Sequence, residues 1–129
     1  MRKTGRTVGE HQEQVSVELV GEVIIARMQG TSTLDLLDVR YERILELHRY
    51  TGCTALLIDD REVSEIPHEA IRTQQLLSLS LDMLRFRIAV LVPDARMAYF
   101  ARLQFGMTNH QVFIDDMPGA MRWLAPMSN

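Results

Sequence analysis

Cysteine, lysine and long apolar runs are scarce in this 129-residue sequence, and each scarcity excludes a class of protein. Cys53 is the only cysteine, so no disulfide can form within the chain. No apolar run approaches the ~20 residues that a membrane-spanning helix needs. The amino terminus lacks the apolar stretch of a secretory signal. We therefore expect a soluble, cytoplasmic protein without stable membrane insertion.

Positive charge and catalytic motifs are also in short supply. The 14 basic residues face 17 acidic ones, and a net charge of −3 argues against nucleic acid as a partner. None of the four histidines has the spacing of a metal-ligand pair, and no serine forms a recognisable motif with a histidine. Cys53 follows a predicted helix stop and precedes an apolar run, which is typical of a small core residue. We predict no enzyme activity, no bound metal and no cofactor.

What is present is the composition of one globular domain, with 47% hydrophobic and 24% charged residues. Residues 1–13 are polar and contain two glycines, so we predict a flexible amino-terminal arm. No repeat or linker interrupts the remainder, and we expect residues 14–129 to form a single domain.

Hydrophobic periodicity predicts elements in the order β-β-α-β-α-β-α-β-α. Strands are expected at 15–19, 23–28, 54–58, 87–92 and 111–114, and helices at about 34–51, 67–84, 95–105 and 117–124. The first helix is expected to bury Leu34, Leu37, Tyr41, Ile44, Leu45 and His48. Such alternation predicts an α/β fold, with a five-stranded mixed, mostly parallel sheet and about four helices.

Three stretches carry a resemblance to the STAS domains, the family of the SpoIIAA-like anti-sigma-factor antagonists. They are LLIDDREV at 56–63, RIAVLVPDARMAYFARLQF at 87–105 and VFIDDMPGAMRWL at 112–124. The resemblance covers residues 15–124 and implies a STAS-like fold. It also implies a non-catalytic regulatory or protein-interaction module from a bacterial group of unassigned function.

The sequence departs from the antagonists after the third strand. In that family, the loop carries an aspartate followed closely by a serine or threonine that a kinase phosphorylates. Here residues 59–63 read DDREV, and Ser64 is the nearest hydroxyl. The resemblance therefore does not extend to phosphorylation of this loop.

Charged and hydroxyl side chains follow the predicted parallel strands, whose carboxyl ends are the usual place for a ligand. An acidic rim there would attract a cationic partner, whereas the neutral segment 31–33 would suit an anion held with Arg61 or Arg96. Ordinary helix capping is the alternative for these residues. The candidate ligand residues are Thr31, Ser32, Asp59, Asp60, Arg61 and Arg96.

The second predicted helix is apolar around most of its circumference at LLSLSLDML, residues 76–84. A helix that packs on one sheet face needs only one apolar stripe. We therefore predict docking of another protein, or a homodimer, through Leu76, Leu79 and Met83. The alternative is burial within the domain. A second functional reading is a small-ligand or lipid-binding domain, with an apolar pocket under the methionine- and aromatic-rich helix at 95–105.

Overall fold

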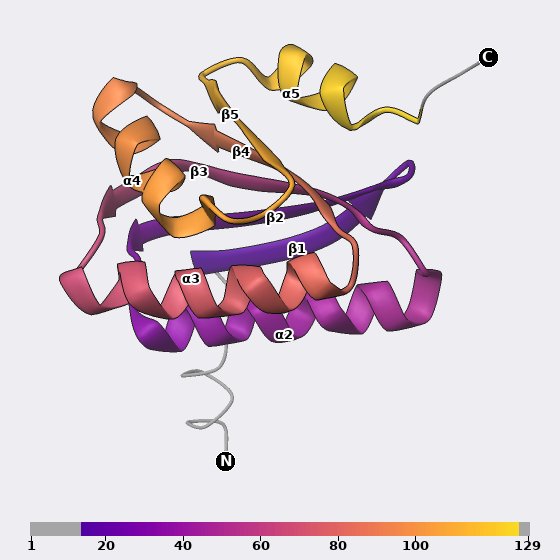
Figure 1. The fold of residues 1–129 in the computed structure, drawn as a ribbon, viewed down its shortest axis with the longest axis horizontal. Coiled ribbons are helices and arrows are strands. Elements are labelled where there is room, and N and C mark those ends of the chain that lie inside the picture. Colours follow the sequence, from indigo (N-terminus) through magenta and orange to yellow (C-terminus); the bar gives the residue numbers. More distant parts are fainter. Residues whose placement is uncertain (1–13, 127–129) are drawn as a thin grey trace.

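Residues 14–126 are the part of the chain described by the computed structural model, and they contain a five-stranded sheet with four helices (Figure 1). The predicted arm at 1–13 lies outside the described residues. The strands are β1 (Val15–Val20), β2 (Val23–Thr31), β3 (Ala55–Glu65), β4 (Arg87–Val92) and β5 (His110–Ile114). The helices are α2 (Leu34–Thr51), α3 (His68–Met83), α4 (Ala95–Phe105) and α5 (Met117–Leu124).

The strands lie in the order β1-β2-β3-β4-β5 across the sheet. β1 and β2 form an antiparallel hairpin, and each later pair is parallel. This arrangement confirms the predicted fold class and element order.

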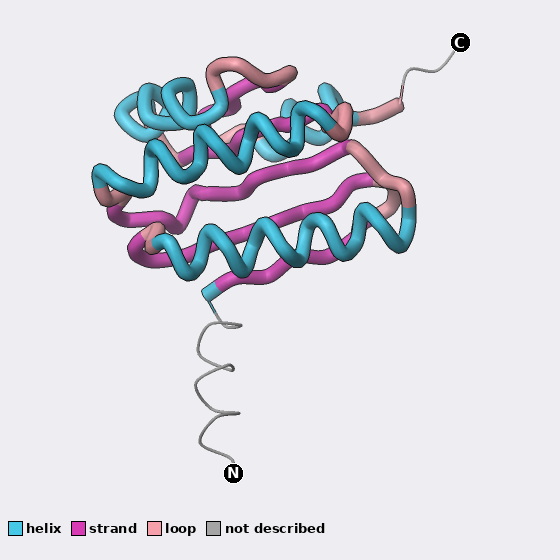
Figure 2. Tube along the Cα trace, turned by 60° about the horizontal axis from the view of Figure 1, so that its bottom comes forward, coloured by secondary structure: helices cyan, strands magenta, loops and turns pink. Residues whose placement is uncertain are grey.

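The two faces of the sheet bury separate apolar clusters. Residues such as Ile24, Ile58 and Val90 face α2, α3 and α4, whereas Leu57 and Ala89 face α5. Alternate residues of a strand point to opposite faces, so both clusters come from the same strands. Figure 2 shows α2 and α3 side by side across the first face. The short α5 covers only part of the second face, and charged side chains occupy the rest of it.

β3 is the main departure from the predicted boundaries. It was expected to end at Ile58, but it continues to Glu65 and takes in residues 59–62, which were predicted to be a loop. The extension follows β2, which runs on to Thr31 and pairs with β3 as far as Glu65. β4 pairs with β3 only up to Asp59. Hydrogen bonding to β2 therefore outweighs the low strand propensity of the aspartates.

The turn that follows β3 is consequently at residues 66–67, and α3 begins at His68. Neither turn residue carries a hydroxyl, and Ser64 is exposed within β3. Residues 59–63, which were compared with the antagonist loop, are thus part of a strand. The turn that does follow the strand, at residues 66–67, also lacks a hydroxyl.

The buried face of α2 also differs from the prediction. Leu34 is 41% exposed, whereas Leu36 and Arg40 are buried beside Leu37 and Ile44. The start of the helix explains the shift, because the Thr33 hydroxyl accepts the Leu36 N–H and directs Leu34 to the solvent. A periodicity count assigns arginine to the solvent side, so it could not place Arg40 in the core.

Candidate functional site

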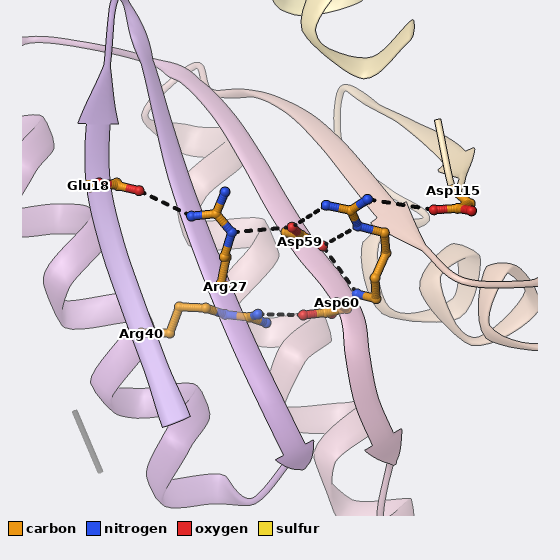
Figure 3. Close-up of polar contacts among 7 residues, drawn as sticks. Glu18, Arg27, Arg40, Asp59, Asp60 and Asp115 are labelled. Carbon is orange, nitrogen blue, oxygen red and sulfur yellow. Dashed lines mark hydrogen bonds and ion pairs between the residues drawn. The ribbon is translucent and has the colours of Figure 1, made fainter. Parts of the chain in front are cut away.

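Asp59 is the centre of a charged group on the face of the sheet that α5 leaves partly open (Figure 3). Its Oδ1 accepts hydrogen bonds from the Arg61 backbone N–H at 3.2 Å and from Arg61 Nε at 3.0 Å. Its Oδ2 accepts one from Arg61 Nη2 at 3.0 Å and lies 3.4 Å from Arg27 Nε. Both carboxylate oxygens are therefore held by arginines.

Strand pairing explains this grouping. Arg27 and Asp59 are register partners on β2 and β3, and Arg61 lies two residues further along the same face of β3. The two arginines also reach outward, Arg27 to Glu18 at 3.1 Å and Arg61 to Asp115 at 3.5 Å. We call this ion-pair series the Asp59 cluster. It connects β1, β2, β3 and the end of β5.

The cluster keeps Asp59 ionised. Burial on its own raises the pKa of Asp59, but the hydrogen bonds from Arg61 and the charges of Arg61 and Arg27 lower it more, so the pKa lies below its usual 3.8. The hydrogen bond to Asp59 in turn raises the pKa of Arg61. Such a carboxylate is hard to protonate and is already bonded to two arginines. It is therefore better suited to linking neighbouring strands by ion pairs than to acid–base catalysis.

Asp60 points to the opposite face and forms a separate buried network. Its Oδ1 accepts from Arg40 Nη1 at 2.6 Å, and Arg40 Nη2 is 3.5 Å from Gln74 Oε1. Gln74 then donates to the Ser78 hydroxyl at 2.9 Å. The network joins α2, β3 and α3 inside the core. The two adjacent aspartates therefore do not form one acidic rim.

The remaining candidate ligand residues lie apart from the cluster. The Thr31 hydroxyl donates to Glu65 at 3.3 Å, and Ser32 is buried with its N–H bonded to the Glu65 carbonyl. Arg96 lies on α4, with Nη1 3.7 Å from Met97 Sδ and its guanidinium over the Phe100 ring. Of the six candidates, the structure brings together only Asp59 and Arg61. Ligand binding at these residues stays a prediction.

Sequence reasoning missed Arg27 and Glu18 because both lie within strands that read as ordinary amphipathic segments. Only the pairing register places them beside Asp59. Over residues 14–126, no group of three histidine, cysteine or acidic residues is arranged to hold a metal ion. The same residues include no helix that is long and apolar enough to cross a bilayer.

A second candidate site is an apolar surface on two neighbouring helices. We call it the α3–α4 surface, and it consists of Leu76, Leu79 and Met83 from α3, Tyr99 and Leu103 from α4, and Met107 just after α4. These side chains are between 39% and 83% exposed. Hydrogen bonds from Gln75 to the Leu103 carbonyl and from the Asn109 N–H to Asp82 join the two segments.

The sequence singled out the three α3 residues of this surface but did not separate the exposed from the buried residues of α4. The side of α4 that faces the sheet is packed into the main core through Met97, Ala98, Ala101 and Phe105. An apolar ligand pocket under this helix is therefore not favoured.

Comparisons with known proteins bear on the fold. No protein-family model matches the chain, and neither does any curated protein sequence. Among solved structures, the anti-sigma factor antagonist SpoIIAA in its unphosphorylated form is 15% identical. It matches with a TM-score of 0.64 over 85% of this chain and 96% of its own.

An uncharacterised protein of the DUF3478 family from Shewanella loihica PV-4, described as having a SpoIIAA-like fold, is 19% identical. It matches with a TM-score of 0.60 over 86% of this chain and 92% of that chain. At these identities the likeness concerns architecture, and it agrees with the element order and strand pairing described above. The chain has a SpoIIAA-like fold.

Proposed function

We propose that this protein is a non-catalytic regulatory module of the STAS type, which acts in the cytoplasm by binding a protein chain through the α3–α4 surface. The observation that carries the proposal is the exposure of large apolar side chains on adjacent helices. Leu76 is 59% exposed and Met83 is 82% exposed. Large apolar side chains exposed together on neighbouring helices are typical of interaction sites.

We propose a second copy of the chain as the partner. Leu76, Leu79 and Met83 lie at positions i, i+3 and i+7 of α3, which is the spacing of a helix–helix seam. The one charged residue in this half of α3, Gln75 to Met83, is Asp82, which is partly buried and accepts a hydrogen bond from the Asn109 N–H. A neutral stripe can face its own symmetry mate without repulsion between like charges, as a twofold interface requires.

The energetics are compatible with a dimer at micromolar concentration. Burying one large apolar side chain stabilises a complex by ~1.5–3 kcal/mol. Three such residues of α3 are repeated across a twofold axis. Their burial can offset the cost of association, which is on the order of 4–15 kcal/mol.

Sedimentation velocity across the micromolar range tests the proposal. We expect a dimer for the wild type and folded monomers for Met83→Glu and Leu79→Glu. Tyr50→Glu is the matched control, because Tyr50 is 88% exposed near the end of α2, outside the α3–α4 surface. It adds the same charge and should leave the dimer intact.

A monomeric wild type throughout this range would refute self-association. Circular dichroism of each variant separates loss of the interface from loss of the fold. Met83→Glu is the most secure variant in this respect, because its side chain is almost fully exposed.

A further inference from the structure

A pocket of about 580 Å³ lies at the edge of the sheet opposite the carboxyl ends of the parallel strands. The β1–β2 turn, the ends of α2 and α5, and the starts of β3 and β4 surround it. In Figure 1 the turn and the end of α5 lie on the same side of the molecule. Its volume is within the usual range for small-molecule sites. We call it the amino-edge pocket.

The lining combines an apolar wall with two arginines. Leu19, Ala55, Leu124, Ala125 and Pro126 supply the wall. Arg85 and Arg87 also line the pocket, and Glu22 is the one acidic residue of the described lining. Neither arginine forms an ion pair with any residue in the described part of the chain. The lining therefore carries an excess of positive charge.

Trp123 holds the guanidinium of Arg87 in place, and one of its N–H donors has no partner in the described part of the chain. Its guanidinium lies 4.1 Å from the centre of the Trp123 ring, and Nη2 donates to the Trp123 carbonyl at the end of α5. Its Nε is buried and has no hydrogen-bond partner among the described residues. A buried donor without an acceptor is costly, so the guanidinium is not satisfied by the described residues alone and favours an anionic partner.

Arg85 has an unusual backbone conformation, which is a second observation independent of the first. Its φ of +68° places it in the left-handed region that normally favours glycine. It follows Leu84, the C-cap of α3, and its N–H bonds to the Asp82 carbonyl while the Phe86 N–H bonds to the Leu81 carbonyl. Helices commonly end this way with glycine at this position. An arginine here adds strain to the backbone while placing a cationic side chain at the pocket.

From these features we infer that the amino-edge pocket binds a small organic carboxylate with an apolar body. The carboxylate pairs with Arg85 and Arg87, and the body lies against the wall of Leu19 and Leu124. The pocket does not overlap the α3–α4 surface, so this inference is independent of the proposed function.

Benzoate is a suitable probe, and titration followed by ¹⁵N–¹H NMR is a suitable measurement. We expect shifts confined to residues that line the pocket, with a dissociation constant on the order of millimolar. Benzyl alcohol has the ring without the charge, and inorganic phosphate has charge without the ring. Both should bind at least about tenfold more weakly. Equal binding of benzyl alcohol would refute the role of the arginines, and equal binding of phosphate would refute the role of the apolar wall.

Arg85→Gly separates binding from folding. Glycine suits a φ of +68°, so the variant should be at least as stable as the wild type while binding benzoate about tenfold more weakly. Arg102→Ala is the matched control, because it removes an exposed arginine of α4 that does not line the pocket. Unchanged binding by Arg85→Gly, or an equal loss in Arg102→Ala, would overturn the inference.

Cys53 provides a second readout. It lines the pocket and is the only thiol in the chain, so a thiol reagent labels a single position. Benzoate should slow this labelling in the wild type and not in Arg85→Gly. If benzoate leaves this labelling unchanged and the NMR shifts map to another surface, benzoate does not bind in the amino-edge pocket.

Discussion

At the scale of single residues, Asp59 and Asp60 show how neighbours of identical chemistry acquire different roles. One side chain faces the open part of the sheet and binds two partly exposed arginines. The other faces the core and binds the buried Arg40. The alternation of a strand separates them, so each is expected to respond differently to substitution.

The Arg40–Asp60 pair gives the larger predicted effect. Arg40 is 3% exposed, and removing its partner leaves a charge without compensation inside the core. We expect Asp60→Ala to lower the free energy of unfolding by about 3–5 kcal/mol. The double variant Arg40→Leu with Asp60→Leu should recover much of that loss, because no buried charge remains. Urea denaturation measures both, and a cost below about 1 kcal/mol for Asp60→Ala would contradict the burial of the pair.

Asp59 predicts a dependence of stability on pH. Because its pKa is lower in the folded chain than its usual 3.8, the unfolded chain takes up the proton first. The contribution of the charged carboxylate is therefore fully present above about pH 4 and is lost as the pH falls through the lower, folded-state value. The advantage of the wild type over Asp59→Asn should hold at neutral pH and shrink as the pH falls below the usual pKa of 3.8. An advantage independent of pH would show that the ion pairs do not stabilise the fold.

At the scale of elements, α5 depends on one capping interaction. The Asp116 side chain accepts the Gly119 N–H at 2.9 Å. A Cβ at position 119 would come within 2.2 Å of Asp116 Oδ2, and its three nearest atoms all belong to that carboxylate. Alanine at this position and the existing cap therefore exclude each other.

The expected outcome is a change of sign. Gly119→Ala should destabilise the wild type by about 1 kcal/mol through loss of the cap. In an Asp116→Ala background the same change should stabilise by about 0.5–1 kcal/mol, because alanine is the better helix former. A double-mutant cycle by chemical denaturation measures the difference. Additive effects would show that the carboxylate does not cap α5.

At the scale of the whole molecule, self-association links stability to protein concentration. A dimer that forms only from folded chains raises the melting temperature as the concentration rises. We expect this rise for the wild type and not for Met83→Glu. Calorimetry over a hundredfold range of about micromolar to submillimolar concentration would show it. A melting temperature that does not change with concentration would argue for a monomer, or for a different partner on the α3–α4 surface.

The sequence alone determined the features that depend on neighbouring residues. Thr33 and Asp94 cap their helices as their side chains predict, and Gly52 ends α2 with a φ of +75°. Residues 87–92 form the predicted strand because Arg87 is followed by five apolar residues and then directly by a proline. Caps and propensities act over a few residues, so the order of the elements could be read before any contact was known.

Only the tertiary structure decided which distant residues meet. The length of β3 depends on β2 continuing beside it, the burial of Arg40 depends on Asp60, and the Asp59 cluster depends on the register of Arg27. The separation of Asp59 from Asp60 has the same origin, because residues that share an edge of the sheet can point to opposite faces. The contact between α3 and α4 likewise decides which of their apolar side chains are buried and which remain exposed on the α3–α4 surface. These outcomes follow from pairing and packing between segments far apart in the chain, which local periodicity does not encode.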